Sequence, residues 1–207
     1  MYLSELQLNP RSRDARRDLA APYEMHRTLK RAFPDGEPEG NRLLFRMEPP
    51  RTEEGGGLRV LVQSSIASPD WSLLPEGYFH QVRGPRPLRP EIPAGTILSF
   101  RLHANPTVKR AGKRQGLMDE EEYLAWLSRK GLEGGFEVLF AHAAKYRLGD
   151  FHSTPTHERK TTIPHFGVRF EGMLQVSNAD EFLKTLSAGV GSAKSFGFGL
   201  LTVARPG

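Results

Sequence analysis

Residues 2–33, YLSELQLNPRSRDARRDLAAPYEMHRTLKRAF, decide the fold at the start of the chain. The first seven of them alternate between apolar and polar side chains, which predicts a β-strand over residues 2–8. A basic stretch, residues 11–18, follows. Pro22 then begins a helix that runs to the end of the stretch, because proline is favoured in a first helical turn, where its missing N–H needs no partner. The chain therefore starts with a strand and a helix.

The same succession of elements continues outward from this stretch. Alternating apolar and polar residues between turn signals predict the further strands, at residues 41–49, 58–65, 77–88, 96–106, 136–148, 163–176 and 200–204. Capping residues and helical periodicity predict a short helix and two longer ones, at residues 68–75, 119–131 and 178–189. Each half of the chain is then strand, helix, strand, strand, helix, strand. This order predicts an α+β protein of two tandem ferredoxin-like (βαββαβ) units.

The boundary between the two units is marked by prolines. Pro85, Pro87, Pro90 and Pro93 exclude a regular helix or a central strand from this segment, which we interpret as a linker. We therefore expect an N-terminal domain over residues 1–88, which carries the first helix, and a C-terminal domain over residues 95–207, which carries a glycine-rich loop. The 21 glycines and 16 prolines together make up about 18% of the 207 residues. An average protein has roughly 12% glycine and proline, so the excess indicates many turns.

Composition narrows the classes of function. The 207 residues contain no cysteine, which excludes disulfides and thiolate metal sites. A hydrophobic fraction of 38% and a charged fraction of 26% exclude a disordered chain. No apolar run approaches the roughly 18 residues of a membrane span, and the first residues lack an apolar signal core, so we expect a cytoplasmic protein with no membrane partner. The net charge of +5 suits a polyanionic partner.

The first candidate for chemistry is the pair Tyr23 and His26. Residues three apart in a helix project from one face, so both side chains should lie together. Histidine transfers protons near neutral pH, and a helix N-terminus beside many cations attracts phosphate. The nearby cations that could bind such a phosphate are Arg27, Lys30 and Arg31. The alternative is an ordinary surface helix with a solvated basic face.

The second candidate is the glycine-rich segment GVGSAKSFGFG, residues 189–199. It lacks the order of a Walker loop and of a dinucleotide fingerprint, since it follows a helix and precedes a strand. Glycine lets backbone approach backbone or phosphate closely. Four residues here are candidates for phosphate binding: Gly189, Gly191, Lys194 and Ser195. A tight helix-to-strand connection explains the glycines equally well.

Two further basic clusters lie in predicted loops. The first contains Lys109, Arg110, Lys113 and Arg114, and the second contains Arg159 and Lys160 at a hairpin tip. Such charge runs are usually solvated, but several basic clusters in a small protein favour nucleic acid. The histidines make no HExxH or HxH pair, and the acids of residues 119–122 fit the first turn of a helix, so we expect no metal site and no cofactor.

At Tyr23-x-x-His26, with GVGSAKSFGFGLL at the end of the chain and RLHANPTVKRAGKR in its middle, the sequence resembles the CasE family. These are CRISPR RNA-processing endoribonucleases that also form a subunit of the type I-E Cascade complex. The resemblance implies two ferredoxin-like domains. It also implies metal-independent cleavage of precursor RNA on the 3′ side of the repeat stem-loop, with the product retained and with other Cascade subunits as partners.

Carried over to this chain, the resemblance implies that His26 transfers a proton and that Tyr23 is its partner at the scissile phosphate. Arg27 and the glycine-rich loop with Lys194 would lie near the RNA backbone, and the loop around Arg159 would approach the stem. RNA supplies its own nucleophile, the 2′-hydroxyl, so the expected products are a 2′,3′-cyclic phosphate and a 5′-hydroxyl. Which of Tyr23 and His26 is the acid and which the base stays open.

Two other functions remain compatible with the sequence. The chain could be a non-catalytic RNA-binding subunit of a ribonucleoprotein, with Tyr23 and His26 as packing residues. It could also be a basic ribosome-associated protein with no preference for a hairpin.

Overall fold

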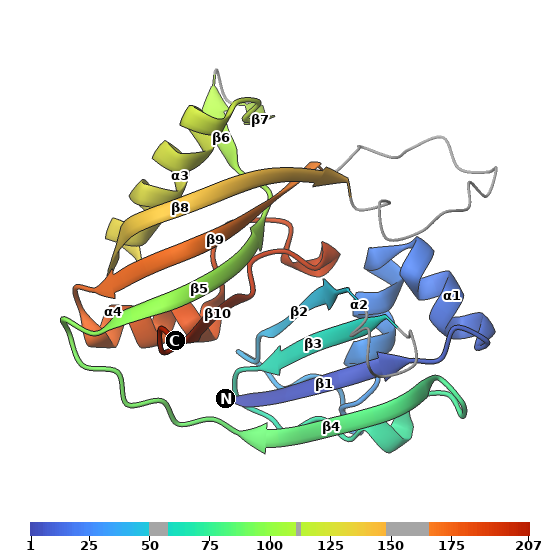
Figure 1. Cartoon of the computed structure of the whole chain (residues 1–207). Helices are drawn as coiled ribbons and strands as arrows, with labels where there is room; N and C mark the ends of the chain where they lie inside the picture. The colour runs from blue at the N-terminus through green and yellow to red at the C-terminus, as the bar shows by residue number, and fades with distance from the viewer. Residues whose placement is uncertain (50–57, 111–112, 148–165) are drawn as a thin grey trace. The chain divides into compact units, whose positions relative to one another are not determined.

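A computed structural model of the chain describes residues 1–49, 58–110, 113–147 and 166–207. The chain forms two compact units (Figure 1). The first unit comprises Met1–Arg89 together with Ser195–Gly197, and the second comprises Pro90–Lys194 and Phe198–Gly207. Each unit contains one four-stranded antiparallel sheet.

The first unit has the connectivity of a ferredoxin-like fold. Its strands are β1 (Tyr2–Leu8), β2 (Leu43–Glu48), β3 (Arg59–Ser64) and β4 (Phe79–Pro87). Its helices are α1 (Arg13–Ala20), α2 (Pro22–Lys30) and a 3₁₀ turn (Trp71–Leu73). The strands lie in the order β2-β3-β1-β4, so the first and third strands of the unit are central. This order is that of a βαββαβ unit in which a single 3₁₀ turn replaces the second helix.

The second unit repeats this connectivity with two full helices. Its sheet is formed by β5 (Ile97–Ala104), β8 (Phe136–Arg147), β9 (Phe166–Val176) and β10 (Leu201–Ala204). Its helices are α3 (Glu120–Glu133) and α4 (Ala179–Ala188). A 3₁₀ turn, Lys194–Phe196, begins at the residue where this unit passes into Ser195–Gly197 of the first unit. The order β10-β5-β9-β8 again places the first and third strands of the unit in the centre. The predicted α+β fold of two ferredoxin-like units is therefore confirmed.

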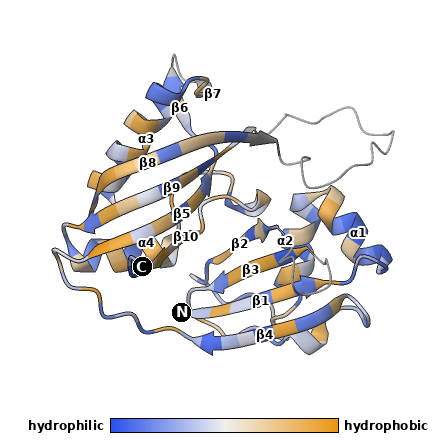
Figure 2. Ribbon diagram, in the orientation of Figure 1, coloured by the Kyte–Doolittle hydropathy of each residue, from blue (hydrophilic) through white to orange (hydrophobic). Residues whose placement is uncertain are grey.

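Alternation along the strands places the core of the first unit beneath its helices. Ser4, Leu6 and Leu8 of β1 are buried, whereas the residues between them are partly exposed. Hydrophobic residues recur between polar ones along the strands of both sheets (Figure 2). Helix α2 buries Met25 and Leu29, four residues apart, as an amphipathic helix does on a sheet. The remaining faces of α2 stay available for polar and charged groups.

Three sequence interpretations need correction. Residues 11–18 are not only a basic stretch, because α1 forms there, with Ser12 accepting a hydrogen bond from the backbone N–H of Ala15. The basic loop at residues 108–116 includes a small hairpin of β6 (Thr107–Arg110) and β7 (Lys113–Gly116). The glycine-rich loop does not lie wholly in the second domain, since Ser195–Gly197 belong to the first unit.

Among the described residues, no helix is both long enough and apolar enough to cross a membrane.

Candidate active site

Helix α2 presents Tyr23 and His26 one turn apart. Pro22 occupies the first position of the helix, as its pattern predicts. Tyr23 lies in the first turn with 51% of its surface exposed, and His26 is half-buried. The predicted placement of the two residues on one helix is correct, with an exposed phenol and a partly buried imidazole three residues apart.

The imidazole of His26 packs against a core ring and is held in its neutral form. Its ring meets that of Phe45 in β2 edge to face, with centroids 6.3 Å apart. Partial burial lowers the pKa of His26 below its usual 6.5, and the charge of Lys30 lowers this pKa further, while Glu37 opposes the shift. At neutral pH the ring therefore offers one nitrogen that accepts a proton and one N–H that donates a hydrogen bond.

The cations predicted on α2 lie at the surface, and two of them are paired. The Arg27 guanidinium lies 3.1 Å from the Glu24 carboxylate, and the Lys30 ammonium lies 2.8 Å from the Glu37 carboxylate. Arg31 is exposed at the C-terminal end of the helix. Exposed ion pairs of this kind contribute at most about 1 kcal/mol. A phosphate group can therefore compete for these cations at low cost.

The glycine-rich loop is closed at its base by backbone hydrogen bonds of the second unit. The N–H of Val190 donates to the carbonyl of Gly199 at 2.9 Å, and the N–H of Gly199 donates to the carbonyl of His103 at 2.7 Å. Gly199 has a φ of +88°, and a Cβ there would lie 2.8 Å from the carbonyl oxygen of Val190. This position excludes any larger residue.

The predicted loop residues divide between the two units. Gly189 follows the last turn of α4, and Gly191 packs on the ring of Trp126, both in the second unit. The side-chain stem of Lys194 lies beside Gly199 in the same unit. Ser195 is half-buried and belongs to the first unit.

The tip of this loop contacts the residues around the α2 pair. The ring of Phe196 lies 5.7 Å from that of Tyr23, centroid to centroid, with the planes inclined by 34°. Gly197, with a φ of +86°, approaches the ring of Phe45 so closely that a Cβ would lie 3.0 Å from its Cε2. Sequence reasoning named neither Phe196 nor Phe45. Nothing in the local pattern links them to α2, since they lie far from it in the chain.

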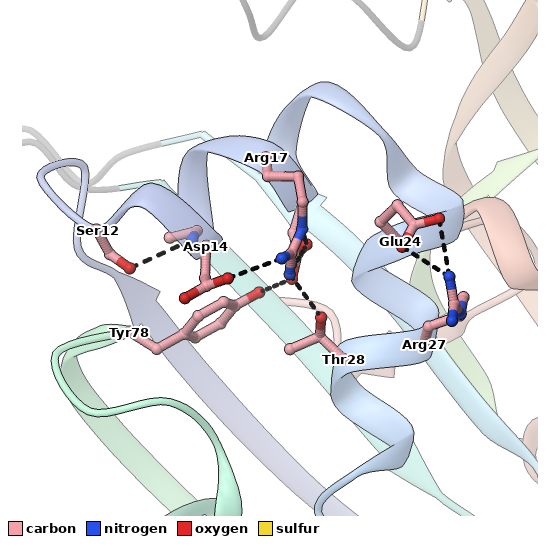
Figure 3. A network of polar contacts seen from close by, with 9 residues as sticks. Ser12, Asp14, Arg17, Glu24, Arg27, Thr28 and Tyr78 are labelled. Carbon is pink, nitrogen blue, oxygen red and sulfur yellow. Dashed lines mark hydrogen bonds and ion pairs between the residues drawn. The ribbon is translucent and has the colours of Figure 1, made fainter.

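A polar network around the buried carboxylate of Asp18 ties α1 to α2, and sequence reasoning missed it as well (Figure 3). The carboxylate of Asp18, with no exposed surface, accepts hydrogen bonds from the Tyr78 hydroxyl at 2.7 Å and from Nε of Arg17 at 2.8 Å. The Arg17 guanidinium also donates to Asp14 and, at 3.4 Å, to the hydroxyl of Thr28 in α2. Burial, followed by the Asp18 charge and its hydrogen bond, raises the pKa of Tyr78, which therefore stays a donor.

The basic hairpin concentrates like charges in register. Lys109 is the cross-strand partner of Arg114, and Arg110 is that of Lys113. Arg159 and Lys160 lie outside the described residues.

Within the described ranges, no three acidic or histidine side chains gather as a group that could hold a metal ion.

Comparison with known proteins assigns the family. The model of a family described as CRISPR associated protein matches residues 1–205. The chain belongs to this family. It is 42% identical to the CRISPR-associated endoribonuclease Cse3 of Thermus thermophilus, over 99% of this chain and 100% of the relative. It is 30% identical to the CRISPR system Cascade subunit CasE of Escherichia coli, over 99% of each. The predicted resemblance to the CasE family is confirmed.

A solved structure extends the similarity to three dimensions. The Thermus thermophilus Cse3 structure bound to an RNA that represents a pre-cleavage complex matches with a TM-score of 0.85 and 42% identity. The match covers 99% of this chain and 98% of the other. The similarity therefore includes both units and is not confined to one shared domain.

Proposed function

We propose that this chain is an endoribonuclease that binds the stem-loop of a CRISPR repeat in precursor RNA, cleaves on the 3′ side of the stem and keeps the product bound. The observation that carries the proposal is the neutral, half-buried His26 beside the exposed Tyr23 on α2. Full-length similarity to a protein named as a CRISPR-associated endoribonuclease supports the substrate and the reaction.

The proposed reaction follows from which group of the site can accept a proton and which can donate one. His26 accepts the proton of the 2′-hydroxyl, because its lowered pKa keeps the imidazole unprotonated at neutral pH. The 2′-oxygen then forms a bond to phosphorus as the bond from phosphorus to the 5′-oxygen breaks. The leaving 5′-oxygen takes a proton from the phenol of Tyr23. The products are a 2′,3′-cyclic phosphate and a 5′-hydroxyl, with no external nucleophile.

Positive charge binds the RNA backbone and offsets the charge that develops on the phosphorane. We assign this role to Arg27, Lys30 and Arg31 of α2 and to Lys194 of the glycine-rich loop. We also assign contacts with stem phosphates to the four cations of the β6–β7 hairpin, Lys109, Arg110, Lys113 and Arg114. We propose that Arg159 and Lys160 also approach the RNA stem, on the basis of their position in the sequence alone. Stem recognition rests mostly on shape and phosphate contacts, because the major groove of A-form RNA is deep and narrow.

A cleavage assay with two substrates and one variant tests the proposed reaction. The wild-type protein is expected to cut a labelled repeat hairpin in EDTA and to leave intact a hairpin with a single 2′-deoxy residue at the cut site. His26→Ala should lose cleavage by about 10²–10⁴-fold while still binding, as expected for a proton-transfer residue. Full activity of His26→Ala, or cleavage of the 2′-deoxy hairpin, would contradict the proposal.

A purely structural role in a ribonucleoprotein is the second candidate, because one relative is named as a Cascade subunit. In that case the wild-type protein and His26→Ala would bind the hairpin with equal affinity and yield no product under any condition.

A further inference from the structure

The glycine-rich loop does more than the sequence suggests, because its tip is built into the surroundings of the α2 pair. Its 3₁₀ turn, Lys194–Phe196, ends on an aromatic residue, and Ser195–Gly197 belong to the same compact unit as α2. Phe196 is half-buried, and its ring lies 5.7 Å from that of Tyr23 at an inclination of 34°. Aromatic rings at this separation attract each other in tilted and offset arrangements.

The next residue of the loop explains why Phe196 can reach this place. Gly197 is buried with a φ of +86°, in a region that L side chains rarely adopt. A Cβ at Gly197 would lie 3.0 Å from Cε2 of Phe45, so only glycine fits against this ring without displacement. Phe45 itself is fully buried in β2 and therefore fixed by the core. The loop tip is thus anchored on a rigid ring.

Phe45 is also the ring on which His26 packs, at 6.3 Å and 60°. Of two consecutive loop residues, one therefore lies against Tyr23 and the other against the ring on which His26 packs. Phe196 contacts Tyr23 directly, and Gly197 contacts the ring that supports His26. His26 packs on a core ring, whereas Tyr23, with half of its surface exposed, has Phe196 as an aromatic neighbour.

We propose that Phe196 is a positioning residue, whose ring holds the phenol of Tyr23 in the orientation needed at the scissile phosphate. The inference rests on the proposed function, since it requires that Tyr23 takes part in cleavage. It assigns the loop tip to the organisation of the reacting groups, in addition to any phosphate contact that the loop makes. A residue that orients a reacting group changes the rate of cleavage but not the affinity for substrate.

The test is a double-mutant cycle between Phe196 and Tyr23. The variants are Phe196→Ala, Tyr23→Ala, the double variant and the conservative Phe196→Tyr, which keeps a ring of the same shape. Phe140→Ala serves as the control, because this residue is an aromatic side chain with 60% exposure in β8. Single-turnover cleavage of a labelled repeat hairpin is followed at saturating protein, with incubations long enough to measure residual rates. Affinity is measured with the 2′-deoxy hairpin.

Phe196→Ala is expected to slow cleavage by about 10–10²-fold with a Kd within twofold of wild type, because misplacing a reacting group by about 1 Å can cost ~10²-fold in rate. Phe196→Tyr and Phe140→Ala should cleave within twofold of wild type. In the Tyr23→Ala background, removal of the Phe196 ring should change the rate less than twofold, because the group that it orients is gone. A similar loss in both backgrounds, a loss explained by weaker RNA binding, or no loss at all would overturn the proposal.

A second readout does not depend on activity. In protein labelled with 3-fluorotyrosine, the ¹⁹F resonance of Tyr23, assigned with Tyr23→Phe, should move and broaden in Phe196→Ala but not in Phe140→Ala. An unchanged resonance would overturn the inference. If Tyr23→Ala cleaves like wild type, the role of Tyr23 in the proposed function fails, and the inference fails with it. If Tyr23→Ala is slow but Phe196→Ala is not, only the inference fails.

Discussion

The imidazole of His26 meets the ring of Phe45 edge to face, with centroids 6.3 Å apart and planes inclined by 60°. Phe45 is fully buried in β2, so its ring moves only with the core of the unit. His26 is partly buried, and this desolvation is the main cause of its lowered pKa. The packing of α2 on the sheet of the first unit therefore contributes to both the position and the protonation state of the proposed base.

The first prediction concerns pH. The kcat/KM of cleavage should be constant at neutral pH and should fall as the pH drops below 6.5, because His26 must be unprotonated and its pKa lies below that value. The profile of kcat/KM measures it, since this parameter reports the free protein. A profile that rises towards low pH would assign His26 as the acid instead.

Two charge variants test the electrostatic contributions to the lowered pKa of His26. Lys30→Gln should raise the pKa of His26, and Glu37→Gln should lower it, as measured by NMR titration of the imidazole. The lowered pKa of His26 also predicts how the free energy of unfolding depends on pH. The unfolded chain takes up the His26 proton at about 6.5, above the folded pKa, so stability falls as the pH decreases through this window.

The second prediction concerns the approach of the loop to Phe45. Gly197→Ala should destabilise the protein by more than the ~1–2 kcal/mol of a left-handed backbone, because its Cβ would also lie 3.0 Å from Phe45. Gly36→Ala is the matched control, with a φ of +84° and no atom within 4 Å of the added Cβ. Urea unfolding of both variants makes the comparison. Equal losses of stability would show that the contact with Phe45 carries no constraint.

The third prediction concerns the network beneath α1. Tyr78→Phe removes a hydrogen bond to the buried carboxylate of Asp18 and should cost about 1–3 kcal/mol of stability. Tyr123→Phe should cost less, about 1 kcal/mol, because the buried Tyr123 hydroxyl donates to a neutral carbonyl, that of Leu117. Urea unfolding measures both. If the Tyr123 variant loses as much, the charge of Asp18 has no special part in the network.

The fourth prediction concerns the basic hairpin. Lys109→Ala should weaken RNA binding and reduce the slope of log affinity against log salt by about 1, since one phosphate contact is lost. Lys184→Ala, at an exposed lysine of α4 paired with Glu181, should leave the slope unchanged. Titrations of the hairpin RNA at several salt concentrations provide the slopes. Unchanged slopes for Lys109→Ala would remove the hairpin from the RNA interface.

Much of the architecture followed from local pattern. Alternation over residues 2–8 predicted β1 in full, and the sheet order of each unit agrees with the repeated order of elements. Helix α1 was missed because the polar composition of residues 11–18 hid its buried stripe of Ala15, Asp18 and Leu19. Ser12, the residue that caps it, was the available signal.

The candidate site was likewise predictable from local sequence only in part. Helical geometry alone places Tyr23 and His26 on one side of α2, because a spacing of three residues corresponds to nearly one turn. The partners of this pair depend on contacts between distant parts of the chain. Phe45 and Phe196 come from a strand and a loop outside α2, and Tyr78 lies 60 residues beyond Asp18. Periodicity carries no information about which distant side chains meet, since strand order and core packing decide that once the sheet has formed.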